Sequence, residues 1–347
     1  MTGTSDTPAI SVILPTPFDF ASIATTVRHL RRQTIADRIE LVIAAMERDD
    51  FTVDPGACEG LWGTQLVHSG RGSHGEACAA GVRAARAPIV AFAEDHCFPE
   101  PGWAEALLDG YTSGEIAAVG PVFRNANPGT LLSWCDFALA YGPWMAPGRG
   151  GDHPFLAGHN SSYRREALLG LGSRLDDLLE AETVLYLELR NQGRRLVLQP
   201  RARSAHTNFA HRGAWISSQF HGGRVFAAER AKRWGRPRRA LYTVASPLIP
   251  LVRLVRTLGH LRRAEAPRPS LVRVAPLLTL GLLLDGAGQC LGYLVGSGRS
   301  VARLTDFEFG RVKFVAERDR DLWSEPPGHS GAVEDGSADR VSSPASQ

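Results

Sequence analysis

Three residues with the chemistry of metal ligands directly follow an apolar run in the first third of the chain. Residues 89–92 read Ile-Val-Ala-Phe, and Glu94, Asp95 and His96 come just after them. If the run is a buried strand, these side chains emerge at the carboxyl edge of a sheet, where α/β proteins bind ligands. Glu94 and His96 are two residues apart, so in an extended chain they point the same way. Carboxylate and imidazole together predict a site for Mn²⁺ or Mg²⁺ that faces a diphosphate.

The elements that must position these residues alternate between apolar runs and helical patterns. We expect strands at residues 10–14, 39–43, 65–68, 89–92 and 117–119, and helices at residues 21–33, 75–86 and 103–111. Strands that alternate with helices form right-handed βαβ units. The sequence therefore predicts an α/β fold of Rossmann-like type, with a mostly parallel central sheet flanked by helices.

A basic and apolar region follows this predicted domain. Between Glu229 and Arg273 the chain has twelve Arg or Lys and two Glu, a net charge of +10. Residues 240–252 carry no charge, and residues 274–298 carry only Asp285. A membrane-spanning helix needs about 20 apolar residues, so these helices either span a membrane, lie on it, or pack on the rest of the protein. The charge favours an anionic membrane surface as partner, and we find no nucleic-acid motif.

We therefore divide the chain into three parts. Residues 1–227 are the expected catalytic or binding domain, residues 228–315 the membrane-associated helices, and residues 316–347 a polar tail that we expect to be disordered.

Composition narrows the class of protein further. The chain has 347 residues, of which 44% are hydrophobic and 22% charged, as in ordinary globular proteins. Its five cysteines include no Cys-x-x-Cys pair, which argues against a disulfide scaffold or a structural zinc site and favours a reducing compartment. The first ten residues lack both a basic region and an apolar run, so we expect no secretory signal.

Four segments, in order, give the chain a family resemblance. Residues 89–103 (IVAFAEDHCFPEPGW) resemble the strand, acidic motif, x-x-Pro and Trp-containing helix of family 2 glycosyltransferases with the GT-A fold. Residues 11–16 (SVILPT) look like the first strand and nucleotide-contacting turn of that family, and residues 158–165 (GHNSSYRR) like its acceptor-side segment. Residues 180–206 are similar to its Glu-Asp…Gly…His block. The resemblance covers about residues 10–225.

The resemblance implies an inverting transfer of a sugar from a nucleotide-sugar donor to an acceptor hydroxyl. It places the base at Glu182, with Glu180 as the alternative, and a start-of-helix position favours an ionised carboxylate there. The acceptor would be a lipid-linked glycan or a surface polysaccharide, at the cytoplasmic face of the cell membrane.

The resemblance also distributes the binding roles. It implies that the donor contacts Pro15, Thr16, Glu94 and Asp95, and that the metal ligands are Glu94, His96 and His206. The acceptor would contact Gly158, His159 and Asn160, where glycine permits close backbone approach and the amide offers both a donor and an acceptor. Alternatives remain: His206 as a structural histidine, residues 158–160 as a simple turn, and Trp134, Tyr141 and Trp144 as either core or an apolar platform.

A second function from another class stays open. In the family, the second strand ends in a carboxylate that meets the nucleobase, whereas residues 43–46 here read Ile-Ala-Ala-Met. This absence, with Glu-Asp-His in place of Asp-x-Asp, suggests a degenerate GT-A fold that acts as a membrane-bound nucleotide-sugar or partner-binding module. An unrelated Rossmann-type enzyme is disfavoured, because residues 15–20 contain no glycine of a Gly-x-Gly-x-x-Gly loop.

Overall fold

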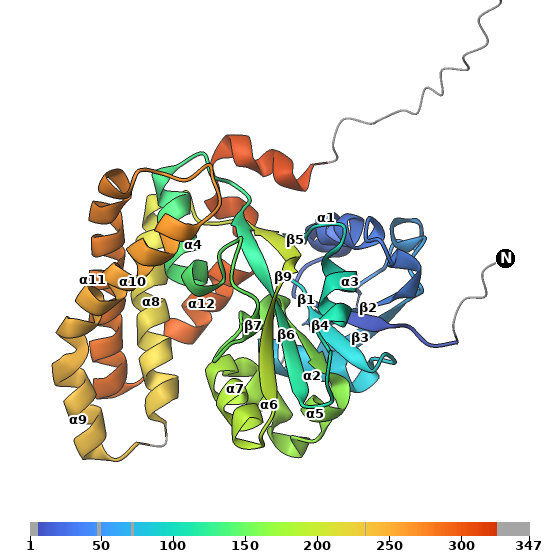
Figure 1. Ribbon diagram of the computed structural model, residues 1–347, viewed down its shortest axis with the longest axis horizontal. Coiled ribbons are helices and arrows are strands. Elements are labelled where there is room, and N and C mark those ends of the chain that lie inside the picture. Colours follow the sequence, from blue (N-terminus) through green and yellow to red (C-terminus); the bar gives the residue numbers. More distant parts are fainter. Residues whose placement is uncertain (1–5, 47–49, 71–72, 233, 325–347) are drawn as a thin grey trace, which may run out of the picture.

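A nine-stranded, mostly parallel sheet organises the N-terminal two-thirds of the protein (Figure 1). The computed structural model describes residues 6–46, 50–70, 73–232 and 234–324. The sheet order is β3-β2-β1-β4-β8-β6-β9-β5, and β7 pairs with β9. The strands are β1 (Ile10–Thr16), β2 (Ile39–Met46), β3 (Gly63–Gly70), β4 (Ile89–Phe92), β5 (Cys97–Pro99), β6 (Ile116–Asn125), β7 (Gly151–Asp152), β8 (Ser162–Arg164) and β9 (Arg195–His206).

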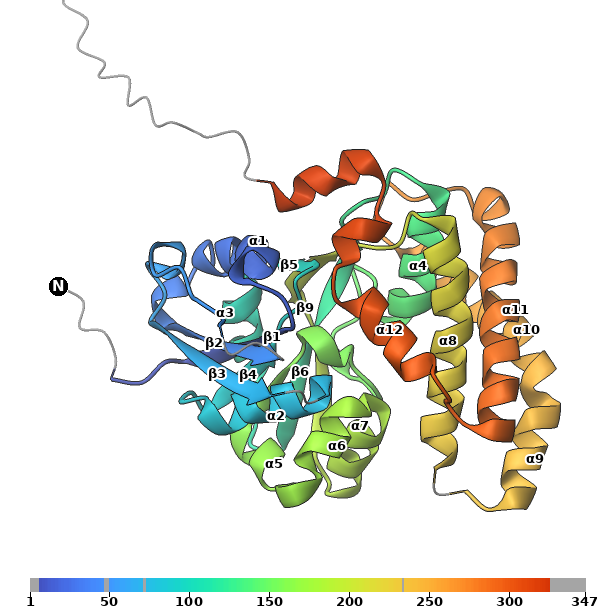
Figure 2. The same cartoon turned by 180° about the vertical axis from the view of Figure 1, so that it is seen from behind.

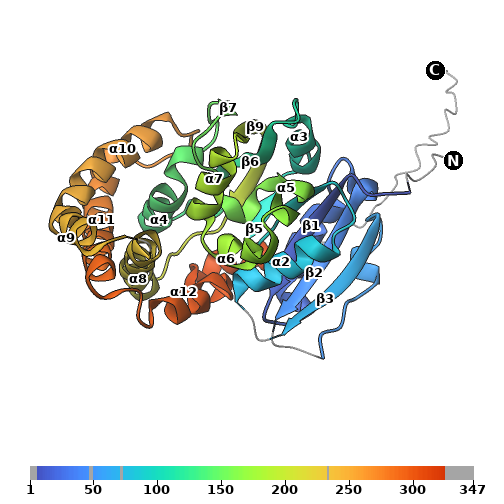
Figure 3. The ribbon, with the colours of Figure 1, turned by 90° about the horizontal axis from the view of Figure 1, so that it is seen from below.

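Helices cover both faces of this sheet (Figure 3). One face carries α1 (Phe20–Arg31) and α3 (Trp103–Asp109). The other face carries α2 (His74–Ala84), α5 (Arg165–Leu169), α6 (Leu175–Glu180) and α7 (Glu182–Asn191). Neighbouring residues of the buried strands divide between the two cores, because successive side chains of a strand point to opposite faces. The predicted α/β class is therefore confirmed.

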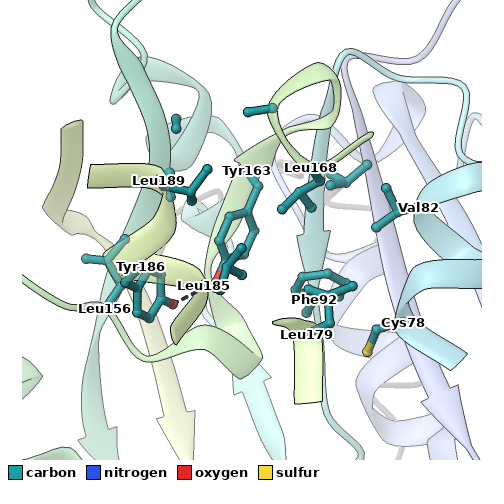
Figure 4. Close-up of a cluster of buried hydrophobic side chains, with 14 of the residues drawn as sticks. Cys78, Val82, Phe92, Leu156, Tyr163, Leu168, Leu179, Leu185, Tyr186 and Leu189 are labelled. Carbon is teal, nitrogen blue, oxygen red and sulfur yellow. Dashed lines mark hydrogen bonds between the residues drawn. The ribbon is translucent and has the colours of Figure 1, made fainter. Parts of the chain in front are cut away.

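The core between the sheet and α2, α5, α6 and α7 is apolar and closely packed (Figure 4). Tyr163 of β8 and Tyr186 of α7 are both 1% exposed, and their hydroxyls are hydrogen-bonded at 2.7 Å. Each buried hydroxyl thus has a partner, which removes the cost of burying it. This core fixes α7 against the sheet and thereby positions the residue with which α7 begins, Glu182.

A second, helical layer lies beside the sheet domain (Figure 2). It consists of α4 (Leu131–Tyr141), α8 (Arg212–Ala231), α9 (Arg236–Ala245), α10 (Ile249–Arg263), α11 (Leu271–Val295) and α12 (Ser300–Glu308). Short 3₁₀ helices join the elements: η1 (Ala36–Arg38), η2 (Gly56–Cys58), η3 (Gly142–Trp144), η4 (Gly158–Asn160), η5 (Gly172–Arg174), η6 (Ser246–Leu248), η7 (Arg311–Phe314) and η8 (Glu317–Trp323). The predicted apolar C-terminal helices are present.

Glycines let α11 pack directly on the backbone of α8. A Cβ atom added to Gly288 would overlap the Phe220 carbonyl oxygen, and one added to Gly292 would overlap the Arg224 carbonyl oxygen. Only residues without a Cβ allow so close an approach. The two helices therefore form one rigid unit.

This packing gives a stability prediction. We expect Gly288→Ala to lower the free energy of unfolding by about 1–3 kcal/mol, because the helices must separate to admit the methyl group. The matched control is Gly259→Ala in α10, where an added Cβ meets no atom within 4 Å. There, better helix propensity is expected to raise stability by about 0.5–1 kcal/mol. Thermal unfolding followed by circular dichroism measures both; equal effects of the two substitutions would contradict the close α8–α11 contact.

The structure bears differently on the two sequence-based predictions about chain organisation, the domain boundary and the disordered tail. The predicted boundary after residue 227 falls inside the continuous helix α8, and the three-part division stays a prediction. The expected tail disorder is wrong for residues 316–324: they form η8 and its ends, and the Trp323 ring packs against Phe98 with ring centroids 5.7 Å apart. The sequence pattern missed this because one tryptophan anchors an otherwise polar segment. Residues 325–347 lie outside the described residues.

Candidate active site

The carboxyl end of β4 presents Glu94, Asp95 and His96, all buried. The Thr26 hydroxyl of α1 donates a 2.7 Å hydrogen bond to the Glu94 carbonyl oxygen and so fixes the turn. The Glu94 carboxylate (Oε2) lies 4.0 Å from His96 Nε2, so the two side chains do converge. His96 Nδ1 lies 2.6 Å from Asp95 Oδ1. Asp95 thus orients the imidazole and leaves Nε2 for another partner.

His206, at the end of β9, joins this group from across the sheet. Its ring centroid is 5.0 Å from that of His96, because β5 and β9 pair antiparallel with Cys97 opposite His206. His206 Nδ1 is 2.9 Å from Asn208 Oδ1, which leaves Nε2 unused. Burial and the charge of His96 lower the pKa of His206 well below its usual value, so this imidazole is neutral at pH 7.

Glu94, His96 and His206 fit a divalent cation. Each offers one ligand atom, and the three atoms lie within 4.8 Å of one another. Two of the ligands are imidazoles whose second nitrogen is held by a carboxylate or an amide, as in metal sites generally. Imidazole ligands favour Mn²⁺ over Mg²⁺, which prefers oxygen ligands.

The 3₁₀ helix η4 consists of the three residues that we expected to contact the acceptor. His159 bridges two carboxylates, with Nδ1 3.4 Å from Glu94 Oε1 and Nε2 3.0 Å from Glu182 Oε1. Burial alone would lower the pKa of His159. The negative charges of Glu182 and Glu94 have the larger effect and raise this pKa well above its usual value. Asn160 Nδ2 donates a 2.7 Å hydrogen bond to Glu94 Oε2. Asn160 therefore orients Glu94, whereas Gly158 and His159 line the cavity described below.

Glu182 is the first residue of α7, and its carboxylate turns towards η4. The Gly158 amide donates a 3.2 Å hydrogen bond to Glu182 Oε2. A Cβ atom at position 158 would overlap that carboxyl group, so a larger residue there would displace the Glu182 side chain. Glu182 is consequently held by a backbone amide and an imidazole, at the edge of the cavity.

Glu180, the alternative base, lies elsewhere. It ends α6 and is exposed, and its Oε2 accepts a 2.7 Å hydrogen bond from the Gly75 amide in the first turn of α2. This carboxylate caps a helix N-terminus. The structure does not bring Glu180 together with the other candidate residues that line the cavity.

The turn after β1 lies on the other side of Glu94. Pro15 lines a small cavity together with His74, Glu94, Asp95 and His96. The Thr16 hydroxyl accepts a 3.1 Å hydrogen bond from the Phe18 amide and shares another with Ser22. Thr16 therefore shapes the turn.

A cavity of about 390 Å³ joins these groups to the helical layer. Glu94, His159, Glu182 and His206 are among its polar lining residues. Two of the aromatic residues left open above, Tyr141 and Trp144, line its wall; the third, Trp134, does not. This volume accommodates a small organic ligand.

Three residues of this site carried no recognisable signal in the sequence. Asp136 of α4, Glu308 at the end of α12 and Arg311 of η7 all line the cavity. Arg311 Nη2 lies 3.3 Å from His96 Nε2 and 3.5 Å from Glu308 Oε2, and its Nη1 lies 3.8 Å from Asp136 Oδ2. Burial raises the pKa of Asp136 to about 6, and the Arg311 guanidinium partly offsets this. Glu308 and Arg311 stand more than 200 positions after Glu94, so no local pattern connects them.

Burial also makes Glu94 a weak acid in this state. Its pKa is raised to about 7, because desolvation outweighs the charges of His96 and His159, and the nearby Glu308 carboxylate adds to the rise. A bound cation would favour the ionised form. The charge state of Glu94 thus depends on what occupies the site.

Comparison with known proteins identifies the domain. The family model described as "Glycosyl transferase family 2" matches residues 11–172. No match was found among curated protein sequences.

Similar solved structures include three at low identity. GalNAc-T7 with UDP, GalNAc and Mn²⁺ is 15% identical with a TM-score of 0.42, over 58% of this chain and 44% of that one. The mannosyltransferase PcManGT from Pyrobaculum calidifontis, in complex with GDP-Man and Mn²⁺, is 17% identical with a TM-score of 0.42, over 92% and 84% of the two chains. A mycobacterial protein is 19% identical with a TM-score of 0.41, over 65% and 74%. The chain thus spans less than half of the length of GalNAc-T7, and similarities this low assign no substrate.

The family match agrees with the resemblance carried by the motifs at residues 11–16, 89–103 and 158–165. The chain therefore contains a glycosyltransferase family 2 domain of the GT-A fold over residues 11–172.

Proposed function

We propose that this protein is an inverting glycosyltransferase that moves a sugar from a nucleotide-sugar donor to an acceptor hydroxyl at the cytoplasmic face of the cell membrane. One observation carries the proposal. Glu182, held by the Gly158 amide and His159, lines the same cavity as Glu94 and His206, two of the residues that could hold a cation. The candidate base and two candidate cation ligands thus border one cavity, with His159 between Glu182 and Glu94.

The chemistry follows from this arrangement. Glu182 accepts the proton of the acceptor hydroxyl while that oxygen bonds to the anomeric carbon. The bond from that carbon to the diphosphate breaks, and its electron pair leaves with the diphosphate. Mn²⁺ or Mg²⁺, held by Glu94, His96 and His206, would supply positive charge opposite the leaving group. His159, protonated between two carboxylates, keeps Glu182 in place.

The test is the stereochemistry of the product. Purified protein is incubated with α-linked UDP-, GDP- and dTDP-sugars, with vesicle-borne or soluble glycan acceptors, and the released or transferred sugar is followed by proton NMR. The proposal expects a β-anomeric product from an α-linked donor. An α-anomeric product would overturn the inverting assignment. Binding of a nucleotide without turnover of any donor would favour the second candidate, the degenerate binding module.

The helical layer supports the membrane part of the proposal. Two segments among the described residues are long and apolar enough to cross a membrane, Arg236–Arg263 and Leu271–Val295. Their outward side is apolar and exposed, notably at Leu241, Val244, Leu248, Leu251, Val252, Val255, Leu283, Leu294 and Val295. Figure 3 places α9, α10 and α11 on the side of the molecule away from β1, β2 and β3.

The packing of α11 favours helices that lie on the bilayer. The glycine contacts fix α11 to α8, which carries Arg224, Glu229 and Arg230. If α11 spanned the membrane, these charges would enter the hydrocarbon at a cost of about 2.5–3.5 kcal/mol each. An interfacial layer keeps α8 in water and places the many arginines of α9 and α10 at anionic headgroups. Five free cysteines are consistent with the reducing, cytoplasmic side.

We expect the double change Val244→Glu and Val255→Glu to reduce binding to anionic vesicles about tenfold or more. Both side chains are over 70% exposed, and the change removes apolar contact and adds repulsion. Leu187→Glu, on an exposed site of α7, is the control. Co-sedimentation with vesicles of phosphatidylglycerol and phosphatidylcholine gives the partition constants. Equal loss in the control, or unchanged binding of the double variant, would contradict this membrane face.

A further inference from the structure

A C-terminal strap, residues 300–324, crosses the candidate site after leaving the helical layer. It comprises α12, η7 and η8, and Figure 2 shows α12 between α8 and the sheet. Its root is tied to α8: His221 Nδ1 lies 2.8 Å from Ser300 Oγ, and Arg224 Nε donates a 2.9 Å hydrogen bond to the Gly296 carbonyl oxygen. From there the strap passes over the carboxyl ends of β1, β2 and β4.

The ring of Phe309 fills an apolar pocket at the end of β2. It is 8% exposed and packs with Ala44, Met46 and Ala77, and with Phe18 of the turn after β1. In the family that this domain resembles, the end of the second strand meets the nucleobase. Here the described residues at the end of β2, 44–46, carry no carboxylate, and the aromatic ring of Phe309 packs beside them. A planar base and this ring cannot share the pocket.

Two charged strap residues reach the cation ligands. Arg311, 7% exposed, places Nη2 3.3 Å from His96 Nε2, the nitrogen left for a metal. Glu308 Oε1 lies 3.8 Å from the same nitrogen. A guanidinium beside His96 would repel a divalent cation there, and it already neutralises the surrounding carboxylates. Arg311 thus supplies positive charge beside His96, Asp136 and Glu308.

The C-terminal end of the strap is hydrogen-bonded to the acidic motif that contains Asp95. Trp323 Nε1 donates a 3.0 Å hydrogen bond to the Asp95 carbonyl oxygen, and the Thr25 hydroxyl of α1 donates a 3.1 Å hydrogen bond to the Trp323 carbonyl oxygen. The strap therefore contacts the base pocket, the cation ligands and the acidic motif through separate residues.

We propose that the strap is an intramolecular inhibitor that occupies the donor site, and that nucleotide and cation displace its Glu308–Phe314 portion. Phe309 stands in for the nucleobase and Arg311 for the cation. The proposal rests on the proposed donor site. Because the strap follows α11 after four residues, the helical layer and the donor site are connected through the chain.

Hydrogen exchange on the full-length protein tests displacement directly. UDP, GDP and dTDP are each added with Mn²⁺, and amide exchange is followed over residues 300–324 by mass spectrometry. With the nucleotide that binds, we expect exchange over residues 308–314 to become at least tenfold faster. Slower exchange would overturn the proposal, because the strap would then be a clamp that closes on the donor.

Binding affinities of variants give a second measurement. We expect Phe309→Ala and Arg311→Ala to bind the Mn²⁺-nucleotide at least fivefold more tightly than the wild type by calorimetry. Val301→Ala, on the exposed side of α12, is the control and should match the wild type. Weaker binding by Phe309→Ala would overturn the proposal, since the ring would then be part of the nucleotide pocket.

The outcomes separate this proposal from the proposed function. If the wild type binds a nucleotide but strap exchange and variant affinities do not change, the inhibitor proposal fails and the transferase stands. If neither the wild type nor either variant binds any of the three nucleotides, both fail. Binding by the variants alone supports both.

Discussion

Replacing Glu182 by glutamine is expected to reduce the rate of sugar transfer by about 10²–10⁴-fold, the usual contribution of a general base. The amide has nearly the same shape, and its oxygen can still accept the hydrogen bond from the Gly158 amide or from His159. What it cannot do is take a proton from the acceptor hydroxyl. Nucleotide affinity should change little, because Glu182 is not among the candidate cation ligands.

The control for this variant lies on the same helix. Glu188→Gln removes a carboxylate that pairs with Arg174 at 2.8 Å, outside the cavity. Its transfer rate should remain within about twofold of the wild type, since such surface pairs contribute little. Initial rates with a saturating donor measure both variants. Full activity of Glu182→Gln would remove this residue from the role of base, and Glu180→Gln would then be the next variant to assay.

Replacing Glu94 by glutamine is expected to weaken metal-dependent nucleotide binding about 100-fold. Changes to groups that merely orient metal ligands commonly reduce metal affinity 10–100-fold, and Glu94 would contact the cation itself. Glutamine keeps the size of the side chain and can still accept the Asn160 hydrogen bond. The loss is therefore one of charge rather than of packing.

Calorimetric titration with Mn²⁺ present and with EDTA measures this effect. Glu115→Gln, exposed in the turn just before β6, is the control and should bind as the wild type does. Asp95→Asn should show a smaller loss, because Asp95 acts through His96. A Glu94→Gln protein that keeps the full Mn²⁺ dependence would show that the cation binds elsewhere.

Local patterns in the sequence were enough to predict the framework of the sheet. The strands β1, β2 and β4 are nearly continuous apolar runs because both of their faces are covered by helices. Glu94 Oε2 and His96 Nε2 lie 4.0 Å apart, although residues 95 and 96 form a turn and not the extended segment on which the spacing argument was based. These features depend on residues that are close in sequence.

Features that depend on contacts between distant parts of the chain could not be predicted from the sequence. The apolar run of β9 ends at Leu198, whereas the strand extends to His206 because it continues along β6 and pairs with β5. Glu180 and Glu182 are two residues apart and look equivalent in the sequence. Because the chain breaks between α6 and α7, Glu180 contacts α2, whereas Glu182 lines the cavity. Arg311 reaches His96 only through tertiary folding.

The most direct test of the account is calorimetric binding of UDP, GDP and dTDP to the full-length protein, each with Mn²⁺ and with EDTA, repeated on Phe309→Ala. We expect one nucleotide to bind with a stoichiometry of one per chain, EDTA to abolish the binding, and Phe309→Ala to bind that nucleotide more tightly. Absence of binding by both proteins, each shown to be folded by circular dichroism, would contradict a donor site built on Glu94, His96 and His206.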